Sequence, residues 1–186
     1  MQLIPGVPAK AANPLVKLFY WYSKRRYGAV LDPLAVMAHH PRLLTAAGMA
    51  EAGVEKAATA LPASVRELAV YRVATRLGCS WCVDFGTMLQ RNEGLDVDRL
   101  KEIDDYATSD KFTEVERLAI AYADAMTAEP MEVTEEQVAE LDRRLGHRGV
   151  VELTYMISVE NQRTRFNHAL GLTAQGFTSG EACRVP

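Results

Sequence analysis

Apolar residues recur at helical spacing along most of this chain, so the predicted elements are helices. No stretch alternates apolar and polar residues between turn signals, and we therefore expect no sheet. The pattern predicts an all-α fold whose helices cover residues 15–27, 33–39, 42–53, 64–77, 82–93, 96–106, 113–128, 134–145 and 150–170.

Three of these helices begin with a capping-box pattern. A Ser or Thr side chain there accepts from a free N–H of the first turn, and a Glu or Gln three residues later reaches back to the cap's own N–H. Gly78 and Gly94 are well placed to end the helices that precede them. The predicted boxes pair Ser64 with Glu67, Thr113 with Glu116, and Thr134 with Gln137.

The domain organisation follows from the same pattern. A chain of 186 residues is long enough for one domain with a full hydrophobic core. Three prolines make residues 1–14 an irregular arm, residues 15–175 form a single predicted helical domain, and residues 176–186 form a tail.

Charge and hydropathy argue against several classes of partner. The chain has 21 basic and 24 acidic residues, a net charge of −3, so no basic excess points to nucleic acid. No run approaches the roughly 18 apolar residues of a membrane span. The first ten residues lack a charged stretch followed by an apolar run, so we expect no secretory signal, a cytoplasmic location and reduced thiols.

The candidate chemistry centres on Cys79-Ser80-Trp81-Cys82. Two cysteines at this spacing in a reducing compartment indicate redox catalysis or metal binding. A structural zinc site takes four ligands, whereas this chain has one such pair and no suitably spaced histidines, so we expect no metal. We also expect no organic cofactor, and we expect the third cysteine, Cys183, to be a free thiol in the tail.

The start of a helix suits a reactive thiol, because unpaired N–H groups and the helix dipole stabilise a thiolate there. One cysteine can attack a peroxide or a disulfide, and the second can then resolve the product as an intramolecular disulfide. Proton transfer needs a further group. Glu67 is the upstream candidate, although it is equally consistent with a role as the acceptor arm of the Ser64 capping box alone.

Glu67 together with Cys79-Ser80-Trp81-Cys82 resembles the carboxymuconolactone decarboxylase superfamily, specifically its AhpD-like alkylhydroperoxidase branch. Segments 112–124, 151–155 and 161–171 resemble the C-terminal helices of such proteins. The resemblance covers roughly residues 20 to 175.

The resemblance implies an all-helical fold with the cysteine pair at the start of a central helix, and homo-oligomers, commonly trimers or hexamers. It implies reduction of hydroperoxides, followed by re-reduction by a dithiol donor, either a protein or a small thiol. It also implies that Cys82 is the more deeply placed thiol, that Cys79 is its disulfide partner, and that Glu67 is the acid of a proton relay.

One departure from the family pattern concerns the relay. The family places a histidine four residues after the second cysteine, where this chain has Gly86, and Trp81 stands where some members have another histidine. Asp84 is a candidate replacement, although residues two apart on a helix do not face each other, so it does not face Cys82. His168 is the other candidate, because histidine suits proton transfer near neutral pH.

Three functions follow from these observations. The first is a thiol peroxidase that cycles Cys79 and Cys82 between dithiol and disulfide. The second is a lactone decarboxylase, which would not need the cysteine pair. The third is a non-enzymatic helical assembly whose subunit contacts respond to the redox state of the two cysteines.

Overall fold

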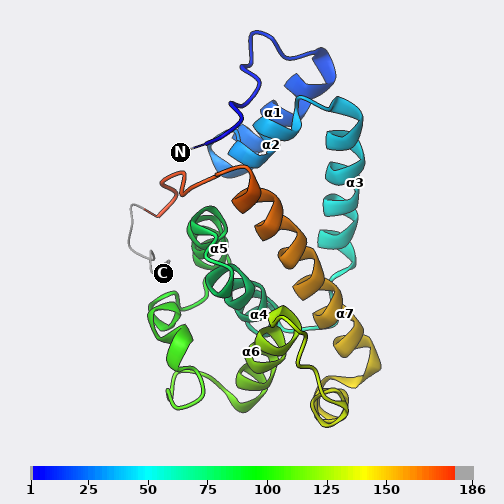
Figure 1. Ribbon diagram of the computed structural model, residues 1–186, viewed down its shortest axis with the longest axis vertical. Helices are drawn as coiled ribbons and strands as arrows, with labels where there is room; N and C mark the ends of the chain where they lie inside the picture. The colour runs from blue at the N-terminus through cyan, green and yellow to red at the C-terminus, as the bar shows by residue number, and fades with distance from the viewer. Residues whose placement is uncertain (1, 179–186) are drawn as a thin grey trace. The chain divides into compact units, whose positions relative to one another are not determined.

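The computed structural model describes residues 2–178, and every regular element within them is a helix, which confirms the predicted all-α fold (Figure 1). The chain divides into two compact units, one made of residues up to Ala58 with Leu170–Leu172, the other of the rest. The elements are α1 (Pro14–Tyr27), α2 (Asp32–Met37), α3 (Pro41–Ala57), α4 (Ala63–Arg76), α5 (Ser80–Asn92), η1 (Asp98–Asp105), α6 (Glu114–Thr127) and α7 (Glu135–Ala169).

The first unit holds α1, α2 and α3 around a small apolar core. Asn13 caps α1, its side chain accepting from the N–H of Val16, and Gly28 ends the helix in the left-handed conformation. The hydroxyl of Tyr20 donates to the carbonyl of Val7 over 2.6 Å and so ties the N-terminal arm to α1. The buried core residues are Ala12, Val16, Tyr20, Ala38 and Leu44.

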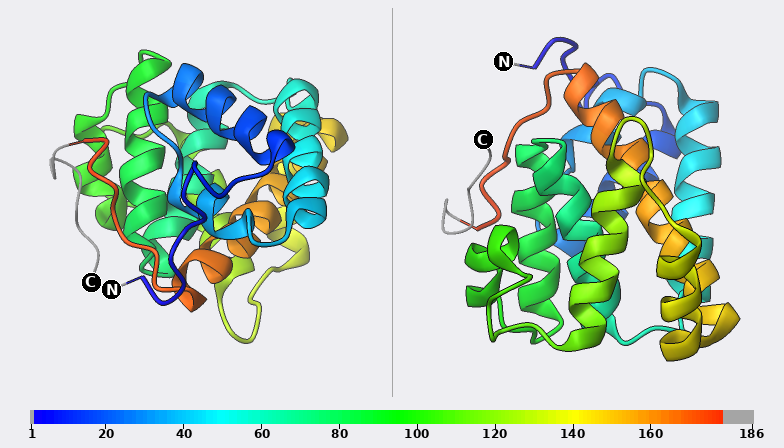
Figure 2. Two further views of the ribbon diagram at one scale, coloured as in Figure 1. Left: turned by 90° about the horizontal axis from the view of Figure 1, so that it is seen from above. Right: turned by 60° about the horizontal axis from the view of Figure 1, so that its bottom comes forward.

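The second unit is built around α4, which packs against α5, α6 and α7 (Figures 1 and 2). Small residues such as Ala69 and Ala123, both fully buried, let these helices approach one another closely. Because α4 has helices on several sides, most of its residues are buried, including the charged Arg72. The site described below therefore rests on a closely packed helical frame.

Two of the three predicted capping boxes are confirmed. Thr113 and Glu116 form the reciprocal pair that begins α6, and Thr134 and Gln137 exchange the same bonds at the start of α7. The predicted Ser64 box is wrong. Pro62 is the cap of α4 and makes no side-chain cap bond, so Ser64 already lies in the first turn, where its hydroxyl interacts with Glu116 instead.

The other predicted boundaries differ only locally. The segment predicted as a helix over 96–106 is a 3₁₀ helix over Asp98–Asp105. The two predicted C-terminal helices meet at Gly146, whose φ of 68° and ψ of 164° interrupt α7. Gly78 and Gly94 follow α4 and α5 with positive φ, as expected for helix stops. Within residues 2–178, no helix is long and apolar enough to cross a membrane.

Candidate functional site

The two cysteines of the CxxC motif lie at the start of α5, as the resemblance implied, and they are joined in a disulfide. Gly78, with φ of 68°, reverses the chain between α4 and α5. Cys79 is the N-cap of α5, and its sulfur accepts from the N–H of Cys82 over 3.2 Å. An unpaired N–H of the first turn is thereby directed at a sulfur atom, which is the arrangement that stabilises a thiolate.

The expected difference in depth between the two cysteines is not confirmed. Cys79 is 2% exposed and Cys82 is 7% exposed, so both are buried and the order is the opposite of the one expected. The N-cap position draws Cys79 back against the end of α4, where its N–H donates to the carbonyl of Ala74. Burial therefore does not distinguish the two sulfurs, whereas their polar neighbours do.

The polar neighbours come from α7. The side-chain amide of Asn167 lies 3.4 Å from the sulfur of Cys82 and 3.9 Å from that of Cys79. The hydroxyl of Thr164 lies 3.5 Å from the sulfur of Cys82. Thr164 and Asn167 are both fully buried, so these donors face the disulfide without competing solvent.

Thr164 also connects the disulfide to a carboxylate. Its hydroxyl lies 3.2 Å from Oε1 of Glu160, one turn earlier on α7. Glu160 is buried, and its other oxygen accepts from Arg163 over 3.3 Å. We did not predict Glu160, Thr164 or Asn167 as site residues. Their spacing of four and three residues, which puts polar side chains on one face of a helix, is the signal that could have identified them.

Glu67 lies on α4 with a side chain that is 13% exposed, and it is not the arm of a capping box, since no such box forms. Arg66 pairs with it over 2.9 Å. Burial raises the pKa of Glu67 above its usual range, although the neighbouring cations Arg66 and Arg163 oppose that rise. A raised pKa makes a carboxylate a better proton acceptor. No hydrogen bond in the described structure joins Glu67 to either sulfur, so its assignment as a relay acid stays a prediction.

Asp84 binds backbone groups of the segment after α7 and not the sulfur atoms. Its two carboxylate oxygens accept from four consecutive backbone N–H groups, over residues 175–178, and from the hydroxyl of Thr178. Burial alone would raise the pKa of Asp84, but these hydrogen bonds lower it below its usual range. Asp84 therefore ties the segment after α7 to α5, and none of these bonds involves a sulfur.

The other two candidates, Trp81 and His168, also contact the protein away from the sulfur atoms. The indole N–H of Trp81 donates to Gln175 over 3.1 Å, and its ring stacks on Phe85 with centroids 4.8 Å apart. His168 is exposed, and its Nδ1 lies 3.2 Å from the carbonyl oxygen of Leu77. Cys183 lies outside the described residues.

The comparisons with known proteins agree with this geometry. Residues 41–125 match the model of the carboxymuconolactone decarboxylase family. The chain is 30% identical over 182 residues to the uncharacterized protein YnjA of Escherichia coli, covering 97% of each chain. The chain belongs to the carboxymuconolactone decarboxylase family.

Solved structures show the same fold in other proteins. A debrominase, Bmp8, solved as a cysteine-to-alanine variant with 2,3,4-tribromopyrrole, is 19% identical, with a TM-score of 0.82 and coverage of 95% of this chain and 94% of that one. An uncharacterized peroxidase-related protein from Ralstonia eutropha, described as an alkylhydroperoxidase AhpD core, is 16% identical, with a TM-score of 0.73 and coverage of 95% of this chain and 94% of that one. Both likenesses extend over nearly the whole chain and establish the fold.

In this member of the carboxymuconolactone decarboxylase family, Gly86 stands where the family has its histidine. A Cβ added at Gly86 would lie 3.5 Å from the ring of Tyr71 on α4, an ordinary contact, and would meet nothing else within 4 Å. The hydroxyl of Tyr71 lies 3.5 Å from the hydroxyl of Thr87, the next residue of α5. The position at which the family has its histidine is therefore faced by the ring of Tyr71.

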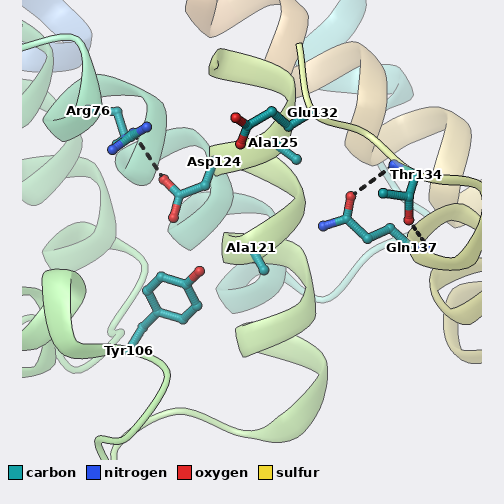
Figure 3. A pocket seen from close by; sticks show the side chains of 8 residues that line it. All are labelled: Arg76, Tyr106, Ala121, Asp124, Ala125, Glu132, Thr134 and Gln137. Atoms are coloured by element: carbon teal, nitrogen blue, oxygen red, sulfur yellow. Dashed lines mark hydrogen bonds and ion pairs between the residues drawn. The ribbon is translucent and has the colours of Figure 1, made fainter. Parts of the chain in front are cut away.

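A pocket of about 470 Å³ lies beside α6 and contains none of the predicted site residues (Figure 3). Two of its charged side chains are paired with each other over 3.4 Å, Asp124 with Arg76, and Asp124 also pairs with Arg72 over 2.7 Å. Among residues 2–178, no three side chains of His, Cys, Asp or Glu are grouped as a metal site requires. The disulfide with its contacts from α7 remains the candidate functional site.

Proposed function

We propose that this protein is a thiol oxidoreductase that reduces hydroperoxides by cycling Cys79 and Cys82 between dithiol and disulfide. The observation that carries the proposal is the pairing of the two sulfurs at the start of α5, with Asn167 and Thr164 directed at them. These donors and the helix N-terminus can stabilise a thiolate, and the bonded sulfurs are close enough for one cysteine to resolve the oxidised form of the other.

The proposed cycle uses no bound organic cofactor. Cys82 attacks the hydroperoxide and becomes a sulfenic acid, and Cys79 displaces water from it to close the disulfide. A dithiol, from a protein or a small molecule, then reduces the disulfide. The likeness to a peroxidase-related protein supports this class of reaction. Cys82 is taken as the attacking thiol because Thr164 and Asn167 lie 3.5 Å and 3.4 Å from its sulfur.

The test uses reduced protein and one equivalent of an organic hydroperoxide, followed by intact-mass measurement and thiol titration. We expect the wild type to lose two hydrogen atoms as the disulfide forms. In Cys79→Ser, we expect a sulfenic acid at Cys82 that a dione reagent traps, and in Cys82→Ser we expect neither product. Cys183→Ser is the matched control and should behave as the wild type does.

Other outcomes would favour the rival functions. Thiols that stay reduced after prolonged exposure would contradict peroxidase activity. Turnover of a muconolactone that persists in the Cys79→Ser/Cys82→Ser protein would indicate a lactone decarboxylase. A change of oligomer size with the redox state, without turnover, would indicate a redox-responsive assembly.

A halogenated pyrrole is worth including among the substrates, because Bmp8 shares this fold and was solved with a tribromopyrrole. The aromatic cluster of Trp81, Phe85 and Phe177 beside the CxxC motif offers apolar surface for such a ring. Release of bromide by the reduced wild type, but not by Cys82→Ser, would extend the thiol chemistry to this substrate class.

A further inference from the structure

A chain of hydrogen-bonding groups leads from Cys82 into α7. The sulfur of Cys82 lies 3.5 Å from Oγ1 of Thr164, and that oxygen lies 3.2 Å from Oε1 of Glu160. All three residues are buried, with Thr164 fully so. Thr164 is therefore placed to contact the sulfur on one side and the carboxylate on the other.

A threonine hydroxyl has one proton to donate and two lone pairs that accept. In the reduced protein, the thiol of Cys82 can donate to the Thr164 oxygen while the Thr164 proton is donated to Glu160. Shifting both protons along this line leaves a thiolate at Cys82 and a protonated Glu160. Reversing the shift returns the proton to the site of reaction.

We propose that Thr164 and Glu160 form the proton relay of Cys82, in the role that the histidine absent at position 86 has elsewhere in the family. Thr164 touches the reacting sulfur, whereas Glu160 acts through Thr164. The proposal rests on the thiol chemistry proposed above.

The relay accounts for every proton in hydroperoxide reduction. The proton of Cys82 passes through Thr164 to Glu160, and the thiolate attacks the terminal oxygen of the hydroperoxide. The O–O bond breaks, sulfur is oxidised to a sulfenic acid, and the leaving alkoxide takes the proton back through Thr164. Cys79 then attacks the sulfenic sulfur, and the proton of Cys79 leaves with the hydroxide as water.

The charges around Glu160 suit this role. Arg163, on α7, contacts Glu160 over 3.3 Å and also interacts with Glu67 of α4. Glu67 in turn pairs with Arg66 and interacts with Glu93 at the end of α5. A cation beside Glu160 favours its carboxylate form, which can accept the hydrogen bond of the Thr164 hydroxyl.

The two possible roles of Glu160, a nearby negative charge or a proton relay, predict opposite changes in the reaction rate of Cys82 when Glu160 is replaced. If Glu160 were only a nearby negative charge, its removal would favour the Cys82 thiolate and speed every reaction of that thiol. Loss of a relay would instead slow most the reactions whose leaving group has to take up a proton. An alkoxide or alkyl thiolate needs one, whereas a nitrobenzoate thiolate and iodide do not.

The experiment compares Glu160→Gln, Thr164→Val and Thr164→Ser in reduced protein in which Cys82 is the only cysteine. The probes are a hydroperoxide, bis(hydroxyethyl) disulfide, an aromatic nitrobenzoate disulfide and iodoacetamide. We expect the Gln and Val variants to react about 10²-fold more slowly with the first two probes, a typical loss for an acid–base group. With the last two probes Glu160→Gln should be as fast as the starting protein or faster, Thr164→Val should be slowed less than with the first two because it loses only a donor to the thiolate, and Thr164→Ser should retain the starting rates.

Several results would overturn the relay. Equal rates of Thr164→Val and Thr164→Ser with bis(hydroxyethyl) disulfide would contradict the relay. A Glu160→Gln protein that reacts faster than the starting protein with all four probes would contradict it as well. Unfolding midpoints identify a variant that is merely destabilised. If the unmodified protein reduces no hydroperoxide, the proposed function fails, but the disulfide probes still test the relay.

Discussion

Asn167 contacts both sulfurs of the CxxC motif, so we expect its side chain to influence how much of Cys82 is in the thiolate form. Asn167→Asp keeps the shape and replaces an N–H donor by a carboxylate, which disfavours a neighbouring thiolate. We expect the thiolate fraction at neutral pH, and with it the alkylation rate of Cys82, to fall by about tenfold or more, since a tenfold change corresponds to about 1.4 kcal/mol. The measurement is the iodoacetamide rate as a function of pH.

The matched control for this substitution is Gln162→Glu, which adds an acid to an exposed position of the same helix. It should leave the alkylation rate unchanged. An Asn167→Asp protein that alkylates as fast as Gln162→Glu would show that the amide does not influence the thiol.

Glu67 gives a stability prediction whose sign follows from its raised pKa. Between the ordinary glutamate pKa, about 4.3, and the higher value of the folded state, the folded protein binds more protons than the unfolded chain. Stability should therefore decrease as pH rises through this window. Glu67→Gln should remove that dependence and be as stable as the wild type, or more stable, at neutral pH. Urea unfolding at several pH values measures both effects.

The prediction for Glu67 fails if the free energy of unfolding of the wild type rises relative to that of Glu67→Gln as pH increases from mildly acidic to neutral. That result would mean that the pair with Arg66 outweighs the cost of burying the carboxylate. Glu132→Gln, which alters an exposed acid that does not interact with Glu67, is a suitable control for the loss of one acid.

At the scale of elements, α5 is tied to the segment that follows α7 through Asp84. Hydrogen bonds to a charged group are typically worth about 1.5–3 kcal/mol, so we expect Asp84→Asn to destabilise the protein by about 2 kcal/mol at neutral pH. The pKa of Asp84 is lowered in the folded state. Its contribution is therefore complete above the unfolded value of about 3.9 and is lost as pH falls through the lower folded value.

The check is urea unfolding of Asp84→Asn beside Asp110→Asn, which alters an exposed aspartate. The difference between Asp84→Asn and the wild type should shrink on acidification, and Asp110→Asn should match the wild type throughout. An Asp84→Asn protein of wild-type stability at neutral pH would contradict the role of Asp84 as a tether.

Helix α4 shows why one element could not be derived fully from local sequence. The pattern Ser64–Glu67 is a valid capping box, yet Pro62 caps the helix and Glu67 is directed elsewhere. The competing interactions come from distant parts of the chain, since Ser64 meets Glu116 of α6 and Glu67 interacts with Arg163 of α7. At Thr113 the box forms as predicted although Glu116 also pairs with Arg99 and Ser64, and at Thr134 the box forms too.

At the scale of the whole molecule, the prediction of a homo-oligomer directs attention to α1. One surface of this helix exposes large apolar side chains, and such patches commonly mark subunit contacts. These residues are Leu15, Leu18, Trp21 and Tyr22, which are 44%, 58%, 63% and 48% exposed. We expect light scattering to give a multiple of the 20.6 kDa chain mass and Leu18→Glu to reduce it.

Lys17→Glu changes a charge at an exposed position of the same helix and should leave the mass unchanged. A monomeric wild type would contradict the predicted oligomer. An oligomer that survives Leu18→Glu would show that α1 is not the contact surface.

The sequence by itself determined the helical fold, most helix boundaries, the family and the importance of Cys79 and Cys82, because periodicity, caps and the CxxC spacing are local properties. Only the tertiary structure placed Asn167 and Thr164 against those cysteines, some 80 residues away along the chain, with Glu160 behind Thr164. It also gave Asp84 the role of a tether, because the N–H groups that it binds lie beyond the last helix. Which side chain meets a sulfur depends on how α7 packs against α4 and α5, and no local pattern encodes that packing.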